Sequence, residues 1–214
     1  MDWQAIILLF ITLIISLTVH EAAHGFFANL GGDPTAKNAG LVTLNPLPHM
    51  QREPTGMVLI PLIVLYMSNG TMCFGGASAP IDPYWAARHP KRAALMSAAG
   101  PLANLLLAAI AFAVLEYIKR PDGSNEEAVF DIALSFLLLN LLLAIFNLIP
   151  LPPFDGAGVV GGLSRPAQRL YDRFQRIPYS SILALLIAWQ LIPYLFFPAF
   201  REVCSWLTYP PSFR

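Results

Sequence analysis

The sequence predicts an all-α protein that crosses a membrane several times. Of its 214 residues, 56% are hydrophobic and 12% are charged, which is about half the charged share of a typical soluble domain. Four apolar segments reach the roughly 20 residues that a bilayer-spanning helix needs. A fifth apolar run is shorter and is broken by a proline.

The four long apolar segments are the expected transmembrane helices. They cover residues 3–30, 93–118, 128–149 and 181–200. The polar hinge "KRPDGSNEE" (119–127) separates the second segment from the third, so these two form a hairpin. The fifth run, "GMVLIPLIVLYM" (56–67), has the length of a re-entrant or interfacial piece, and we expect a short or re-entrant helical segment within 57–74.

Pro- and Gly-rich stretches connect these segments. Examples are "GGASAPIDPYWAARHP" and "LPPFDGAGVVGGLSRP". Non-helical backbone at membrane depth is tolerated only inside protein or beside water, so these loops predict a wet cavity or a membrane rim. We expect one integral-membrane domain over 1–214, with a core at 3–162 and an amphipathic segment and the last span at 163–214.

Charge and cysteine content exclude several classes of protein. The formal net charge is zero, which gives a nucleic-acid partner no support. Cys73 and Cys204 are the two cysteines, and their separation matches neither a zinc motif nor a redox motif. The early apolar run has no basic residues before it, which predicts a retained helix rather than a cleaved signal.

The stretch "SLTVHEAAHGFFANL" (16–30) places three ionisable side chains in the first apolar segment. His20 and His24 are four residues apart, so on a helix both rings project from one face and can reach one zinc ion at about 2.0–2.1 Å. Glu21 then has the position of the base that takes a proton from the attacking water. The alternative is a polar helix interface. Each ionisable group in a membrane segment costs about 2.5–3.5 kcal/mol or more on insertion scales, so three together favour a metal site.

A catalytic zinc ion takes three protein ligands, so the sequence must supply one more. The candidates near apolar segments are His49, His89, Glu116, Asp131 and Asp155. Asp155 directly follows a long apolar helix, within "FNLIPLPPFDG" (146–156). The alternative for this residue is a loop carboxylate in a proline-rich turn, which is the usual role of an Asp-Gly pair. The residues alone leave both possibilities open.

Three motifs in order, "HEAAH" (20–24), "GPLANLLLA" (100–108) and "FNLIPLPPFDG", resemble the site-2 protease family of intramembrane zinc metalloproteases. The resemblance runs from Leu8 to Gly162, and "GGDPTAKNAGLVTLNPLPH" is similar to the compact prokaryotic branch that lacks a PDZ domain. It implies one zinc ion per chain, an integral protein of a prokaryotic cell membrane, and the lipid bilayer as its surroundings.

The resemblance also implies roles for individual residues. His20, His24 and Asp155 match the zinc ligands and Glu21 matches the base. Asn147, in the pattern N-x-x-P-x-P-x-x-D-G, matches a residue that orients substrate or stabilises the oxyanion. Asn104 either acts in a similar way or bonds between helices. One departure is "PHMQREP" (48–54), where related chains often have His-x-Asp-Pro, so no role for His49 follows.

The implied function is hydrolysis of peptide bonds in membrane-anchored protein substrates, within or near the bilayer. The extended stretch "FGGASAPID" (74–82) could pair with such a substrate by strand addition. Two alternatives remain. A metal-ion transporter or channel could use the same His/Asp cluster, although it needs no Glu21 and no inverted repeat is visible. An inactive membrane binding module is the other, although no catalytic position is substituted. The sequence does not indicate an oligomeric state.

Membrane topology follows from the site and from the charges. His20, His24 and Asp155 must meet at one depth, so the first span and the span that ends before Asp155 run towards the same face. The second and third spans form a hairpin, so residue 93 starts on that face too. The segment 57–74 must therefore dip into the membrane and return. The basic residues expected on the zinc side are Lys37, Arg52, Arg88, Lys91, Arg92, Arg165, Arg169, Arg173 and Arg176. The opposite side is expected to hold Lys119, Arg120, Arg201 and Arg214, with the acids Asp122, Glu126, Glu127 and Asp131. By the positive-inside rule the zinc site lies towards the cytoplasmic face and both termini lie outside.

Three smaller expectations concern local structure. Gly100 and Pro101 are expected to open a helix, where proline is common. The four tryptophans are expected to anchor the protein at the membrane interface; they are Trp3, Trp85, Trp189 and Trp206. Four arginines at helical spacing predict an amphipathic helix at the headgroups; they are Arg165, Arg169, Arg173 and Arg176.

Overall fold

The computed structural model describes residues 3–118 and 124–208, and in these residues all regular structure is helical. Four helices are long and apolar enough to cross a membrane, as predicted. They are α1 (Trp3–Leu30), α6 (Pro90–Ile118), α7 (Ser124–Asn147) and α10 (Ser180–Ser205). The chain is therefore an all-α integral membrane protein.

Shorter helices lie between the four long ones. They are α2 (Thr35–Asn38), α3 (Pro46–Arg52), α4 (Ile60–Met67), α5 (Pro83–Arg88), α8 (Asp155–Leu163) and α9 (Arg165–Gln175). A π-helical turn at Thr55–Leu59 leads into α4. Side chains cap the starts of α3, α5 and α9, where Asn45, Asp82 and Ser164 accept hydrogen bonds from backbone N–H groups of the first turn.

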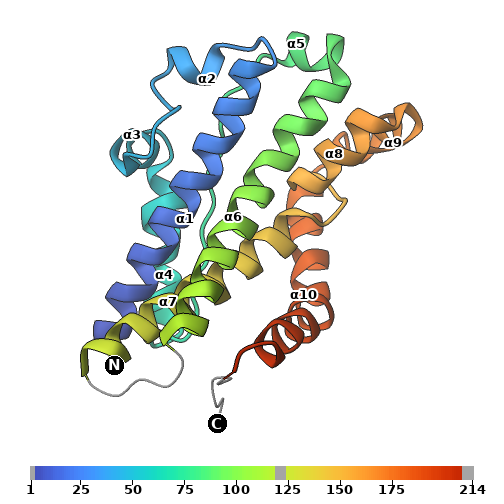
Figure 1. Cartoon of the computed structure of the whole chain (residues 1–214). Helices are drawn as coiled ribbons and strands as arrows, with labels where there is room; N and C mark the ends of the chain where they lie inside the picture. Colours follow the sequence, from blue (N-terminus) through green and yellow to red (C-terminus); the bar gives the residue numbers. More distant parts are fainter. Residues whose placement is uncertain (1–2, 119–123, 209–214) are drawn as a thin grey trace.

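The short apolar helix α4 enters the protein and the chain then turns back. Figure 1 shows α4 pointing to the end where α1 starts, whereas α5 lies at the opposite end, beside α2. The reversal uses left-handed backbone at Asn69 (φ 53°) and Gly70 (φ 82°), conformations that asparagine and glycine tolerate best. Residues 72–82 return without regular secondary structure. The chain path agrees with the predicted dip and return.

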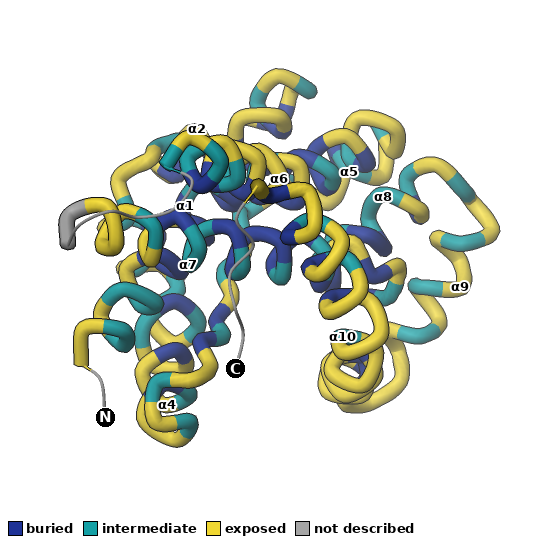
Figure 2. Tube along the Cα trace, turned by 60° about the horizontal axis from the view of Figure 1, so that its bottom comes forward, coloured by how far each residue is buried: buried dark blue, intermediate teal, exposed yellow. Residues whose placement is uncertain are grey.

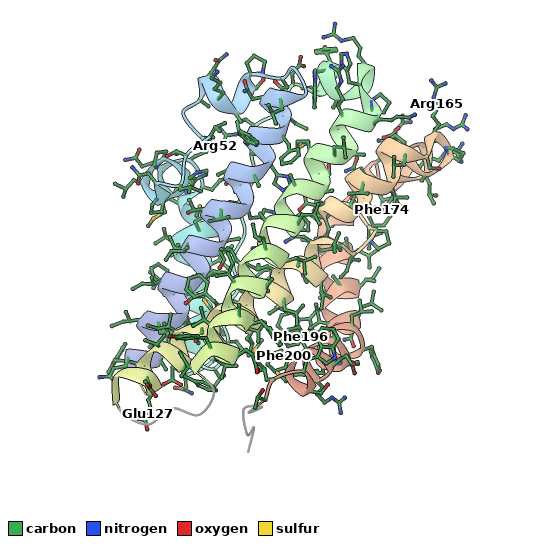
Figure 3. All side chains as sticks on the ribbon, in the orientation of Figure 1. Arg52, Glu127, Arg165, Phe174, Phe196 and Phe200 are labelled. Carbon is green, nitrogen blue, oxygen red and sulfur yellow. The ribbon has the colours of Figure 1, made fainter. Side chains whose placement is uncertain are left out.

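Helices α1, α6 and α7 form the centre of the protein. Figure 2 shows buried residues concentrated on these three helices, whereas α10 keeps large apolar residues exposed, such as Ile182, Leu186 and Phe197. An apolar exposed surface is expected for a helix that faces lipid. Phe196 and Phe200 stack with ring centroids 5.4 Å apart and belong to the core that joins α10 to α6 and α7 (Figure 3).

Three local expectations are wrong. Gly100 and Pro101 lie inside α6, because this helix begins at Pro90 rather than near residue 100. Trp85 is buried rather than interfacial: its Nε1 donates to the carbonyl oxygen of Gly31 at 3.0 Å and so attaches α5 to the end of α1. The hinge 119–127 is shorter than expected, because α7 already begins at Ser124; residues 119–123 lie outside the described residues.

Candidate metal centre

Three ligand-type atoms meet between α1 and the start of α8. His20 and His24, one turn apart on α1, place their Nε2 atoms 3.0 Å from each other. Oδ2 of Asp155, the first residue of α8, lies 3.1 Å from Nε2 of His20 and 3.3 Å from Nε2 of His24. Within the described part of the chain, this is the one group of three His, Cys, Asp or Glu side chains whose ligand atoms converge in this way.

Hydrogen bonds on the far side of each ring determine which nitrogen is free. Nδ1 of His24 lies 2.7 Å from the carbonyl oxygen of Met96, which can only accept, so Nδ1 carries the proton. Nδ1 of His20 lies 2.5 Å from Oδ1 of Asn104, and it donates there in the same way. Both Nε2 lone pairs therefore point towards each other and towards a carboxylate oxygen.

This arrangement fits a zinc ion. Two lone pairs and an anionic oxygen repel one another unless a cation lies between them. Oδ2 of Asp155 is buried and has no hydrogen-bond partner, as expected of an atom reserved for a metal. Tetrahedral ligands at about 2.0–2.1 Å from zinc are about 3.3 Å apart, close to the three distances between His20, His24 and Asp155.

Two glycines allow helices to approach the site closely. A Cβ atom on Gly100 of α6 would lie 2.4 Å from Nε2 of His24 and 2.6 Å from Nε2 of His20. A Cβ atom on Gly158 of α8 would lie 2.3 Å from Oγ of Ser97 on α6. Since real Cβ atoms do not come so close, a larger residue at either position would force its neighbour to move. The sequence analysis missed Gly100, although an isolated glycine inside a long apolar helix is a signal of close packing.

Glu21 lies beside the three converging side chains. It is 4% exposed, and its Oε2 has no hydrogen-bond partner. Together with His20, His24 and Asp155 it lines a cavity of about 330 Å³. The carboxylate is therefore next to the candidate metal position.

Other walls of this cavity come from the returning segment, which the sequence analysis expected to pair with substrate, and from α9, which it did not place at the site. Residues 77–79 and Ile81 of the returning segment line it, as do Gln168, Tyr171 and Gln175 of α9. The Tyr171 hydroxyl donates to the carbonyl oxygen of Pro150 at 3.0 Å, which holds α9 against the loop before Asp155.

Asn147 and Asn104 have different surroundings in the structure. Asn147 is half-buried and lines the cavity, and its Nδ2 donates to the carbonyl oxygen of Leu143 at 3.0 Å. Asn104 is fully buried behind His20 and is not among the cavity residues, so its bond runs between helices.

The remaining candidate ligands lie elsewhere. His49, on α3, is buried with its Nε2 3.0 Å from the carbonyl oxygen of Thr43. It does not belong to the converging group, and neither do His89, Glu116 or Asp131.

Comparison with known proteins gives the family. Residues 8–120 and 117–189 match the family described as Peptidase family M50. The predicted zinc metalloprotease YwhC of Bacillus subtilis (strain 168) is 38% identical over 167 residues, which cover 75% of this chain and 71% of YwhC. The predicted zinc metalloprotease Rip2 of Mycolicibacterium smegmatis is 32% identical over 148 residues, 69% of this chain and 53% of Rip2. Rip2 of Mycobacterium tuberculosis (strain ATCC 25618 / H37Rv) is 29% identical over 177 residues, 82% of this chain and 64% of the relative.

No solved structure matches the chain. The family match covers most of the sequence, and it agrees with a helical membrane protein in which two histidines and an aspartate can hold a metal ion. The chain belongs to peptidase family M50, the site-2 protease family, and is a membrane-embedded zinc metalloprotease.

Proposed function

We propose that this chain is an intramembrane endopeptidase that cleaves membrane-anchored proteins, with His20, His24 and Asp155 as the ligands of one zinc ion. The observation that supports this most directly is the convergence of three ligand atoms within 3.0–3.3 Å of one another, beside a membrane-spanning helix bundle. The proposal treats residues 1–214 as one functional domain, because α8, α9 and the returning segment all contribute to the same cavity.

A zinc ion at this position would polarise the scissile carbonyl and lower the pKa of a coordinated water. Glu21 acts as the general base: its buried carboxylate accepts a proton from the attacking water and passes it to the leaving amine. The missing partner of its Oε2 supports this role, because an oxygen already engaged in a structural bond would be less available to the water.

Asn147 contacts the substrate in this proposal. A side-chain amide has two N–H groups and one oxygen, and Leu143 takes one of the donors. The second N–H of Asn147 is left for the carbonyl oxygen of the scissile bond, where a donor stabilises the developing charge. Asn104 has a different role, since it touches His20 and not the cavity.

The returning segment binds the substrate backbone. A transmembrane helix uses its amides internally, so a substrate must unwind before a protease can reach a peptide bond. Residues 77–79 and Ile81 line the cavity without regular secondary structure, and within the described structure residues 77–81 form no backbone–backbone hydrogen bond with another segment. An unwound substrate strand could therefore pair with 74–82 by strand addition.

We place the zinc site towards the cytoplasmic face of a prokaryotic cell membrane. Support comes from the four arginines of α9 and its C-terminal cap, which are all exposed; they are Arg165, Arg169, Arg173 and Arg176. Basic residues accumulate on the cytoplasmic side of membrane proteins.

The Glu21→Gln variant tests the mechanism. It keeps the shape of the side chain but cannot accept the proton, so cleavage of a model transmembrane substrate should fall by about 10²- to 10⁴-fold or more. Zinc content should stay at the wild-type level. Glu202→Gln, at an exposed site on α10, is the matched control and should cleave normally. Cleavage by Glu21→Gln near the wild-type rate would contradict the role of Glu21, and so would ion transport that persists without any cleavage in the wild-type protein.

A further inference from the structure

A row of buried polar groups extends from the candidate metal centre towards the middle of the membrane-spanning core. Asn140 of α7 and Asn104 of α6 are both fully buried, and Ser16 lies one turn before His20 on α1. Nδ2 of Asn104 donates to Oδ1 of Asn140 at 2.8 Å, and Nδ2 of Asn140 donates to Oγ of Ser16 at 2.9 Å. The row ends where the hydroxyl of Ser16 donates to the carbonyl oxygen of Thr12 at 2.7 Å.

A backbone carbonyl determines the direction of every bond in this row. Nδ2 of Asn140 also lies 2.9 Å from the carbonyl oxygen of Phe136. A carbonyl oxygen only accepts, so the NH₂ group of Asn140 must face it, and the side-chain oxygen must face Asn104. That oxygen needs a donor, which fixes the NH₂ group of Asn104 towards Asn140. The oxygen of Asn104 is then left to face Nδ1 of His20.

The opposite orientation of the Asn104 amide would remove the free lone pair from Nε2 of His20. With its NH₂ group towards His20, Asn104 would favour an Nδ1 lone pair and move the ring proton to Nε2. A protonated Nε2 cannot bind a metal. A lone asparagine can rotate its amide between these two states. Nδ2 of Asn104 lies 2.8 Å from Oδ1 of Asn140 and 3.5 Å from the carbonyl oxygen of Ser16, so Asn140 makes the shorter of the two bonds that hold the amide in one state.

We propose that Asn140 is a positioning residue for the metal centre. It holds the amide of Asn104 so that His20 keeps its proton on Nδ1 and presents the Nε2 lone pair to zinc. This inference rests on the proposed role of His20 as a ligand. Asn140 does not contact zinc, substrate or the cavity, and it acts only through Asn104.

The test is the zinc affinity of the purified full-length protein in detergent, measured by competition with a chelator. Outer partners of metal-bound histidines typically change affinity by about 10- to 100-fold when mutated. We expect a loss in this range for Asn104→Leu and a loss of about tenfold for Asn140→Leu, at the lower end of that range. Asn140→Asp should bind zinc nearly as well as the wild type, because its side chain presents an oxygen to Asn104 in either protonation state.

A double-mutant cycle separates positioning from packing. If Asn140 acts through Asn104, Asn140→Leu should cause no further loss of zinc affinity in the Asn104→Leu background. An equal loss in both backgrounds would overturn the proposal, and so would full zinc affinity of Asn140→Leu. Thr18→Val is the matched control, since the Thr18 hydroxyl is buried and bonds to the carbonyl oxygen of Ile14 with the geometry of Ser16, but lies outside the row.

A further variant distinguishes this inference from the proposed function. If His20→Ala retained wild-type zinc affinity, the ligand assignment itself would fail. If His20→Ala lost zinc while Asn140→Leu kept it, only the role of Asn140 would fail.

Discussion

A Cβ atom on Gly100 of α6 would lie 2.4 Å from Nε2 of His24 on α1. At the candidate metal centre these two helices therefore leave room for no side chain larger than hydrogen at position 100. The same Cβ would lie 2.6 Å from Nε2 of His20. Gly100 therefore defines one wall of the space in which the zinc ion is proposed to bind. The histidine rings cannot simply move aside, because their Nδ1 atoms are bonded to Asn104 and Met96.

The Gly100→Ala variant should lose zinc affinity. An added methyl group in a packed site typically costs about 1–3 kcal/mol, which corresponds to roughly 5- to 150-fold in binding. Chelator competition on the purified protein measures this loss. Gly76→Ala is the control, because a Cβ atom there would meet nothing within 4 Å. Equal zinc affinity of the two variants would show that α6 can move away from α1.

Replacement of Asp155 by Asn should reduce zinc affinity by about 100-fold or more, beyond the 10- to 100-fold effects of outer partners. The variant keeps the size of the side chain but removes the only negative charge among the three candidate ligands. Elemental analysis after purification and dialysis measures the metal content. Asp131→Asn, at an exposed site on α7, should keep its zinc. Undiminished zinc in Asp155→Asn would exclude this residue as a ligand.

Hydropathy and motif spacing predicted the parts of this structure that depend on composition. The four long helices are where the apolar segments are, because a bilayer requires about 20 apolar residues whatever the neighbours are. The convergence of His20, His24 and Asp155 followed from the resemblance of three motifs rather than from the spacing of the residues.

Contacts between helices were not predictable in the same way. The close approach at Gly100, the burial of Trp85 and the bond from His24 to the carbonyl oxygen of Met96 depend on how α1, α5 and α6 pack. One available signal was overlooked. Thr12, Ser16, His20 and His24 recur every four residues in an apolar helix, which places a polar row on one face.

Asp33 should stabilise the protein in a manner that depends on pH. Its carboxylate accepts from the amide and hydroxyl of Thr35 and from the amide of Asp82, so it ties the end of α1 to the start of α5. Burial acts to raise the pKa of Asp33, but these three hydrogen bonds outweigh it and hold the pKa below its usual value of 3.8. The stabilisation is therefore complete at pH values well above 3.8 and is lost as the pH falls through the lower folded-state value.

The Asp33→Ala variant tests this contribution. At pH 7 it should lower the free energy of unfolding in detergent micelles by about 1–3 kcal/mol, the cost of leaving partly buried donors unpaired. The difference from the wild type should shrink when both proteins are unfolded at a pH below the folded-state pKa of Asp33. Asp172→Ala, on the exposed face of α9, should have little effect at either pH. A difference that does not change with pH would contradict the role of the Asp33 charge.

Membrane orientation can be tested at two labelled points of the structure. Figure 3 shows Glu127 at the end of the molecule where α7 begins, and Arg165 near the opposite end. Glu127 belongs to the acidic cluster expected outside, and Arg165 begins the arginine-rich helix expected inside. Of the predicted outer loop, 121–127, residues 121–123 lie outside the described structure, and so do the terminal residues whose outward location was predicted.

Cysteine labelling of intact cells should give opposite results for Glu127→Cys and Arg169→Cys. Both positions are exposed, and both native cysteines are buried, so a background with Cys73→Ala and Cys204→Ala removes residual labelling. A membrane-impermeant maleimide should label Glu127→Cys directly and Arg169→Cys only after the membrane is permeabilised, because the positive-inside rule places the arginine-rich side in the cytoplasm. A chain with five full spans would put residues 57–74 across the membrane and place 127 on the same side as the first loop. Labelling of a first-loop cysteine such as Lys37→Cys in intact cells would therefore rule out the dip-and-return path, and protection of Glu127→Cys would rule out the cytoplasmic orientation of the zinc site.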